Sequence, residues 1–155
     1  MPHTTSKGKN VYSVDLMIAY INIFKPKCHK ININDIKYDI HAKGWGDSGN
    51  ISVNDVLENP KKYKNDYDRI KNAELKYPII MDTKDNIFDG VHRYFKAKIL
   101  NKKCIKVYKF SDSLLNKFII GQNASQIFYF IKSTCNNKFK MVHTGKFLYT
   151  FQFLF

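Results

Sequence analysis

The segment Ile87–Ala97 constrains the fold of this chain more than any other part of its sequence. It begins as a strand, turns at Asp89-Gly90 and continues as a helix from His92. A strand that turns directly into a helix directs the free N–H groups of the helix and the side chains of His92 and Arg93 toward one point. This combination is typical of an anion-binding site, and phosphate suits it best.

The other hydrophobic patterns predict an α/β (α+β) fold, with a compact mixed sheet and short helices. Strands are predicted for segments 11–24 (one or two strands), 36–40, 77–82, 104–110 and 147–155. Ser52 and Asp55 make a capping-box pattern, so a short helix begins there and must end before Pro60. Further helices are predicted for segments 62–73, 92–100 and 111–120, and the composition of segment 44–50 predicts a loop.

The length of 155 residues corresponds to one domain with an appendage. We expect a flexible N-terminus over residues 1–10, a domain over residues 11–120 and an aromatic, basic C-terminal extension over residues 121–155. Aromatic residues alternate from Phe147 to Phe155, which predicts a strand with one apolar face. This strand either packs on the domain or forms a homodimer interface through its edge.

The chain has a net charge of +13, and all but two of its 26 Lys and Arg residues are lysines. Such a surplus attracts the phosphates of nucleotides, nucleic acids or lipid headgroups. The abundance of Lys, Asn and Ile is equally consistent with an AT-rich genome, such as that of a large DNA virus. The only arginines are Arg69 and Arg93, and the second lies in the strand–turn–helix segment.

Composition also excludes several classes of protein. No stretch is long and apolar enough to span a membrane, and residues 1–10 lack the apolar core of a secretion signal. The three separated cysteines, Cys28, Cys104 and Cys135, make neither a disulfide framework nor a zinc site, so no metal site is predicted. We therefore expect a cytoplasmic protein, in the host cytoplasm if the source is a virus.

Four short patterns follow one another between residues 52 and 110: the capped helix, Asn59-Pro60, the strand Tyr77–Met81, and the Asp-Gly-x-His-Arg turn with its helix. In this order they resemble the ParB/sulfiredoxin superfamily, in its ParB-like nuclease-domain branch, over residues 11–118. The resemblance implies a ParB/sulfiredoxin-like fold. It also implies that the turn, matched here by Gly90, His92 and Arg93, binds nucleotide phosphates.

The resemblance leaves more than one activity open. It implies a nucleotide ligand (ATP, ADP or CTP) with Mg²⁺, and an enzyme of this kind would be a phosphotransferase or a nuclease. Val91 stands where sulfiredoxin carries its catalytic cysteine, so sulfinic-acid repair is not implied. The alternatives are a non-catalytic module that binds the DNA backbone and a degenerate domain used for assembly.

Each further candidate residue has a structural alternative. Asp89 can hold Mg²⁺ or act as the catalytic base, or it can only shape the turn. Asp47 can deprotonate a substrate hydroxyl, or it can only shape the loop at 44–50. Trp45, in the same loop, can stack on a nucleotide base or substrate, or it can fill the core.

Overall fold

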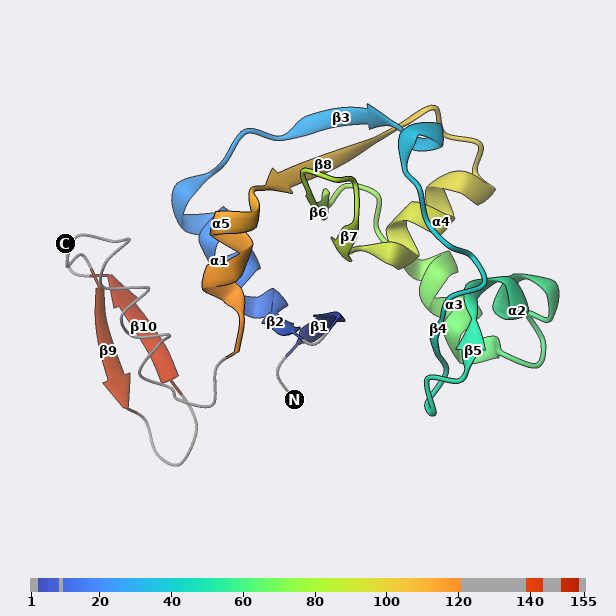
Figure 1. Cartoon of the computed structure of the whole chain (residues 1–155), viewed down its shortest axis with the longest axis horizontal. Coiled ribbons are helices and arrows are strands. Elements are labelled where there is room, and N and C mark those ends of the chain that lie inside the picture. Colours follow the sequence, from blue (N-terminus) through green and yellow to red (C-terminus); the bar gives the residue numbers. More distant parts are fainter. Residues whose placement is uncertain (1–2, 9, 121–138, 144–148, 154–155) are drawn as a thin grey trace.

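A four-stranded mixed sheet lies at the centre of the computed structural model, in the order β3-β8-β6-β7 (Figure 1). Its strands are β3 (His29–Asn32), β8 (Cys104–Phe110), β6 (Ile79–Asp82) and β7 (Ile87–Asp89). The pair β6–β8 is parallel, and the pairs β3–β8 and β6–β7 are antiparallel. Because parallel neighbours need a crossover, β7 and helix α4 (Val91–Ile99) connect β6 to β8.

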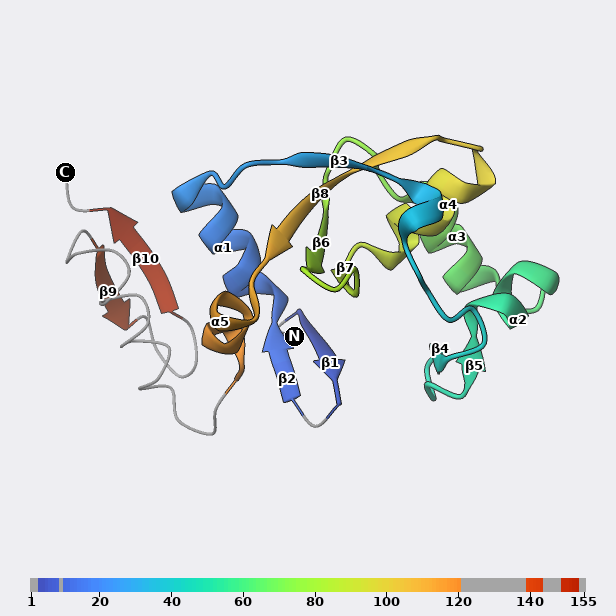
Figure 2. The same cartoon turned by 45° about the horizontal axis from the view of Figure 1, so that its top comes forward.

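The remaining elements lie at the two ends of this sheet (Figures 1 and 2). One end carries α1 (Val14–Phe24), α5 (Asp112–Leu115), the 3₁₀ turn η2 (Asn116–Phe118) and the hairpin of β1 (Thr4–Lys7) with β2 (Asn10–Ser13). The other end carries the 3₁₀ turn η1 (Ile33–Asp35), α2 (Val53–Glu58), α3 (Lys64–Asn72) and the hairpin of β4 (Lys43–Trp45) with β5 (Ile51–Ser52).

The structure describes residues 3–8 and 10–120, together with the backbone of β9 (Phe139–His143) and β10 (Tyr149–Phe153). These two strands pair antiparallel, and β10 lies within the strand predicted at 147–155. The predicted apolar face of that strand, its packing and its use as a dimer interface lie outside the described residues. Within residues 1–10, predicted to be a flexible N-terminus, Thr4–Lys7 form β1 and pair with β2.

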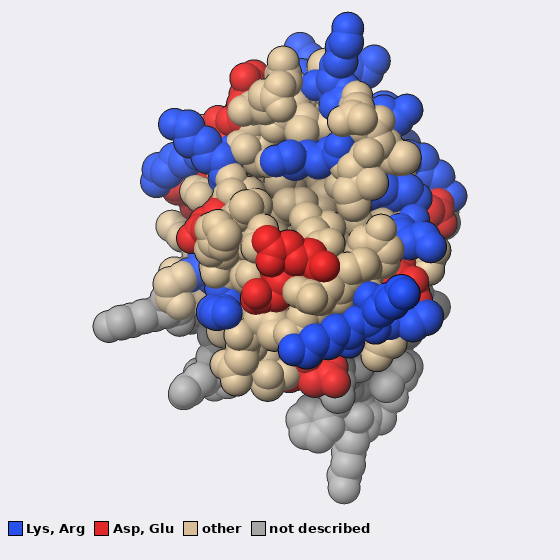
Figure 3. Space-filling view, turned by 90° about the vertical axis from the view of Figure 1, so that its right-hand side faces the viewer, with Lys and Arg blue, Asp and Glu red and all other residues tan. Residues whose placement is uncertain are grey.

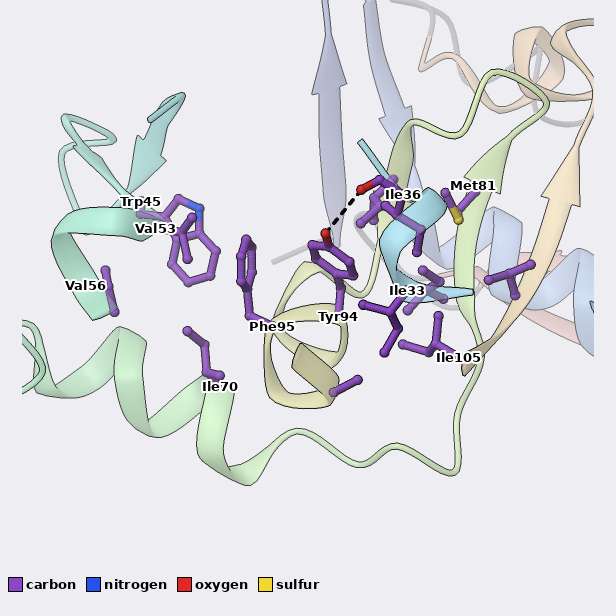
Figure 4. Close-up of a cluster of buried hydrophobic side chains, with 14 residues drawn as sticks. Ile33, Ile36, Trp45, Val53, Val56, Ile70, Met81, Tyr94, Phe95 and Ile105 are labelled. Atoms are coloured by element: carbon purple, nitrogen blue, oxygen red, sulfur yellow. Dashed lines mark hydrogen bonds between the residues drawn. The ribbon is translucent and has the colours of Figure 1, made fainter. Parts of the chain in front are cut away.

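Two hydrophobic clusters cover the two faces of the sheet. The first, drawn in Figure 4, contains Ile33, Ile36, Trp45, Val53, Val56, Ile70, Ile79, Met81, Ile87, Tyr94, Phe95, Ala97, Ile105 and Val107. The second contains Tyr12, Met17, Ile80, Phe88, Phe110, Leu115 and Phe118. Neighbouring residues of β6 alternate between the two clusters, as side chains on a strand buried on both faces must.

The α+β class and most of the predicted elements are confirmed. Ser52 and Asp55 make the predicted capping box, and α2 ends before Pro60. Helices α3 and α4 and strands β6, β7 and β8 lie within or one residue from the predicted segments. Ser111 caps α5 through the backbone N–H of Leu114, but the α-helix ends after four residues and continues as η2.

The prediction of strands over residues 11–24 was wrong for most of that segment, because α1 begins at Val14. The side chain of Ser13 accepts a hydrogen bond from the backbone N–H of Leu16, which caps the helix. Val14 and Met17 are fully buried at helical spacing, so tertiary packing outweighs the β-branched composition.

The predicted strand at 36–40 was also wrong, since this segment has no regular secondary structure. Its alternating apolar residues Ile36, Tyr38 and Ile40 pack on the first cluster from an irregular backbone. The loop predicted at 44–50 is confirmed for residues 46–50, which link β4 to β5, whereas residues 44 and 45 belong to β4. In the described part of the chain, no helix has the length and apolar character that crossing a bilayer requires.

Candidate functional site

The N-terminus of α4 begins at Gly90, which has a φ of 96°. A Cβ atom at this position would lie 2.6 Å from Cγ2 of Ile79 and 2.7 Å from a terminal nitrogen of Arg93. Both the backbone angle and the space therefore require glycine. Gly90 provides no capping side chain, and the first turn of α4 contains no acidic residue. The positive end of this helix is thus left for a group from elsewhere.

Arg93 lies across this helix N-terminus and is held there by Asp89. One of its terminal nitrogens donates a hydrogen bond of 2.6 Å to Oδ2 of Asp89, and the two side chains are only 20% and 16% exposed. Oδ1 of Asp89 lies 3.9 Å from Nε2 of His3. The predicted phosphate-binding guanidinium is therefore fixed in position by a residue that was predicted as a base or a turn former.

His92 is the second side chain at the start of α4. Its ring lies 4.8 Å from the ring of Trp45, at an interplanar angle of 60°. Burial lowers the pKa of His92 to about 4, and the nearby charge of Arg69 acts in the same direction. The imidazole is therefore neutral at physiological pH. Within the described part of the chain, Nε2 of His92 and Nε of Arg93 are buried without a hydrogen-bond partner.

These groups open into a pocket of about 660 Å³. Its walls come from the start of α4, from one side of α3, from the β4–β5 hairpin and from the residues around β1. Lys96 of α4 donates a hydrogen bond of 2.8 Å to the carbonyl of Ala73, which ties α4 to the end of α3. The volume falls in the usual range of small-molecule sites, about 300–1,000 Å³.

All six residues predicted as site residues line this one pocket: Trp45, Asp47, Asp89, Gly90, His92 and Arg93. Trp45 is 8% exposed and belongs to the first hydrophobic cluster, so most of its ring fills the core. Asp47 is exposed in the turn between β4 and β5. The pocket therefore brings together side chains that are far apart in the sequence, such as Trp45 and Arg93.

The lining residues that were missed in the sequence include Asp66 and Arg69. They lie three positions apart on α3, so they share one side of the helix with Ala73, which also lines the pocket. Both arginines of the chain consequently face the same pocket. The sequence does contain one signal that pointed to Arg69. It is one of only two arginines, whereas the other Lys and Arg residues of the chain are lysines.

The pocket is mixed in charge. Besides the two guanidinium groups it contains four carboxylates: Asp47, Asp66, Glu74 and Asp89. Figure 3, which faces the end of the molecule with α2 and α3, likewise shows acidic side chains between groups of lysines and arginines. On this face the net positive charge does not form a continuous basic surface. In the described part of the chain, no three His, Cys, Asp or Glu side chains are grouped so that they could hold a metal ion.

Comparisons of the chain with protein-family models, with curated proteins and with solved structures give no match. The ParB/sulfiredoxin resemblance therefore stays a prediction. The residues of the pocket must carry any functional proposal.

Proposed function

We propose that the pocket binds a nucleotide through its phosphates, with Gly90, His92 and Arg93 as the contact residues. The observation that carries this proposal is that both arginines of a lysine-rich chain line the pocket at the uncapped N-terminus of α4. A guanidinium presents a planar fork of N–H donors that matches phosphate oxygens, which a lysine ammonium does not. The resemblance to the ParB-like branch implies the same three residues.

Each contact has its own physical basis. Arg93 keeps N–H groups for a ligand, because Asp89 accepts from one terminal nitrogen and Nε has no described partner. A phosphate oxygen would satisfy this buried donor, whose desolvation otherwise costs about 1–3 kcal/mol. Neutral His92 can bond a phosphate oxygen through a ring N–H. At Gly90, the absence of a side chain lets the guanidinium of Arg93 pack against the backbone, beside the free N–H groups at the start of α4 that would bind the phosphate.

The carboxylates of the pocket favour a nucleotide that is complexed with Mg²⁺ over a free polyanion. Four carboxylates would repel bare phosphates, and a divalent cation between the two would reverse that effect. Mg²⁺ commonly takes one or two carboxylates together with phosphate oxygens and water. Such a site needs no group of three protein ligands, so it is compatible with the described residues.

The proposed reaction is Mg²⁺-dependent phosphoryl transfer or phosphodiester hydrolysis. An attacking hydroxyl or water would form a bond to phosphorus, the bond to the leaving oxygen would break, and a carboxylate would take the proton. Asp89 is engaged by Arg93, whereas the carboxylate of Asp47 is exposed at the pocket. Asp47 is therefore the better candidate for the base.

Thermal-shift titrations with ATP, ADP, CTP and GTP, each with and without Mg²⁺, test the proposal. A nucleotide at 100 times its dissociation constant should stabilise the wild type by about 2.7 kcal/mol. This stabilisation should disappear in Arg93→Ala and persist in Lys98→Ala, a control at an exposed position of the same helix. The proposal fails if no nucleotide raises the melting temperature, or if Arg93→Ala responds like the wild type.

The net charge of +13 favours a second candidate, a module that binds the DNA backbone without catalysis. This candidate predicts that affinity for duplex DNA falls about 10³-fold or more between 50 and 200 mM salt if six or more phosphates are neutralised. A binding curve that hardly changes between the two salt concentrations would reject it.

A further inference from the structure

The two arginines of the pocket are paired with carboxylates in different ways. Arg93 lies 2.6 Å from Asp89, and both side chains are largely buried. Arg69 lies 3.8 Å from Asp66, at the limit for an ion pair, and its side chain is 67% exposed although that of Asp66 is 14% exposed. The first guanidinium is therefore held in a close pair, whereas the exposed guanidinium of Arg69 makes only a long contact with its carboxylate.

Both guanidinium groups act on the same imidazole. Among the charges that shift the pKa of His92, that of Arg69 has the largest effect, and that of Arg93 also contributes. Arg69 lines the pocket from α3, and Arg93 lines it beside His92 at the start of α4. A ligand in this pocket would therefore have one guanidinium in the wall from α3 and one in the wall from α4.

We propose that Arg69 is a second phosphate-binding residue and that the ligand carries a diphosphate group, two phosphates joined by one bridging oxygen. This inference rests on the proposed function. One phosphate is bound at the start of α4 by Arg93 and His92. The adjacent phosphate is bound by Arg69, which leaves Asp66 and turns toward the ligand. Asp66 keeps Arg69 over the pocket when no ligand is bound.

A purely structural role accounts less well for Arg69. The contact between Arg69 and Asp66 is long and the guanidinium is exposed, so this ion pair adds little to stability. On the same face of α3, a lysine would make such a pair equally well, yet this is one of only two positions in the chain with arginine. Planar recognition of phosphate is the property that distinguishes the two side chains.

Calorimetric titration with inorganic phosphate and with pyrophosphate, each with Mg²⁺, tests the inference on the full chain. The wild type should bind pyrophosphate at least about tenfold more tightly than phosphate, the gain expected from one added charge-assisted contact. In Arg69→Ala the difference should shrink to less than about threefold, and Arg69→Lys should restore only part of it. Lys71→Ala, an exposed position outside the pocket on the same helix, is the matched charge control and should behave like the wild type.

The outcomes separate this inference from the proposed function. If phosphate and pyrophosphate bind equally and Arg69→Ala changes neither, the diphosphate inference is wrong and phosphate binding stands. If neither binds and nucleotides also fail to bind, the proposed function is wrong as well. A third outcome would also overturn the inference. If a short single-stranded oligonucleotide binds more tightly than pyrophosphate, and this binding depends on Arg69, the two phosphates belong to a nucleic-acid backbone.

Discussion

The helices α2 and α4 begin in opposite ways. At α2, the side chain of Ser52 accepts from the backbone N–H of Asp55, and the carboxylate of Asp55 accepts from the backbone N–H and the hydroxyl of Ser52. At α4, Gly90 has no side chain to do this, and the nearest charged group on the helix is the guanidinium of Arg93. The first N-terminus satisfies its own donors, and the second leaves them open beside a pocket.

This difference separates a helix start that stabilises the fold from one for which we propose a binding role. A carboxylate in the first turn stabilises a helix, whereas a cation there is unfavourable. At α4 the cation is Arg93, and its hydrogen bond to Asp89 offsets part of the unfavourable interaction with the helix dipole. An anionic ligand would supply the negative charge that the first turn of α4 lacks. Changes at α2 should therefore affect stability alone, and changes at α4 should affect binding.

The largest effect on stability is expected for Gly90→Ala, at the N-cap of α4. The new Cβ atom would meet Ile79 and Arg93 at a backbone angle that disfavours side chains. Strain and overpacking together should lower the free energy of unfolding by about 3 kcal/mol. Urea unfolding at equilibrium measures this loss.

Gly49→Ala is the matched control for this substitution. Gly49 has a φ of 67° and nothing within 4 Å of an added Cβ, so only the backbone strain of about 1 kcal/mol applies. If the two variants lose the same free energy of unfolding, close packing around Gly90 does not restrict this position to glycine. The contrast between the two helix starts would then be weaker.

The next effect is the dependence of stability on pH through His92. Its pKa in the folded protein is about 4, mainly because of burial, against about 6.5 in an unfolded chain. The unfolded chain takes up the proton first, so this contribution to stability is complete above about pH 6.5 and is lost as pH falls toward 4. We expect a loss of about 2 kcal/mol, less than the full shift because the ring is only partly buried.

Urea unfolding of the wild type and of His92→Gln across this pH range isolates the effect. Carboxylates titrate in both proteins, so the difference between the two curves reports on the imidazole. If the free energies of unfolding of the two proteins change in parallel from pH 7 to pH 4, the start of α4 does not disfavour a protonated His92. The expected loss of stability would then be wrong.

The smallest effect is expected for Ser52→Ala at the start of α2. Removing the cap should lower the free energy of unfolding by about 1 kcal/mol. Because Ser52 lies outside the pocket, nucleotide affinity should stay unchanged. If Ser52→Ala is fully folded but binds nucleotide more weakly than the wild type, the start of α2 also affects binding and the contrast between the two helices fails.

Local signals in the sequence predicted the elements that depend on nearby residues. The capping box of Ser52 and Asp55, the Asp89-Gly90 turn and the alternating strand Cys104–Phe110 are each specified within a few positions. The same local signals predicted the turn and the start of α4, while the binding role of this segment stays a prediction.

What could not be predicted depends on contacts between distant segments. Residues 14–24 have β-branched character, but their burial against the second cluster selects a helix. Asp66 and Arg69 reach the pocket only because α3 packs beside α4, as the bond from Lys96 to the carbonyl of Ala73 indicates. No pattern within α3 itself reveals that neighbour.

Backbone amide chemical shifts, followed by NMR as ADP and Mg²⁺ are added, test the central claim most directly. The account predicts that the largest changes occur at the amides of Val91, His92 and Arg93, while those of residues 53–55 at the start of α2 stay in place. Arg93→Ala should abolish the changes. Shifts spread over lysines elsewhere on the surface, or no shift at the start of α4, would contradict the claim that this helix N-terminus binds phosphate.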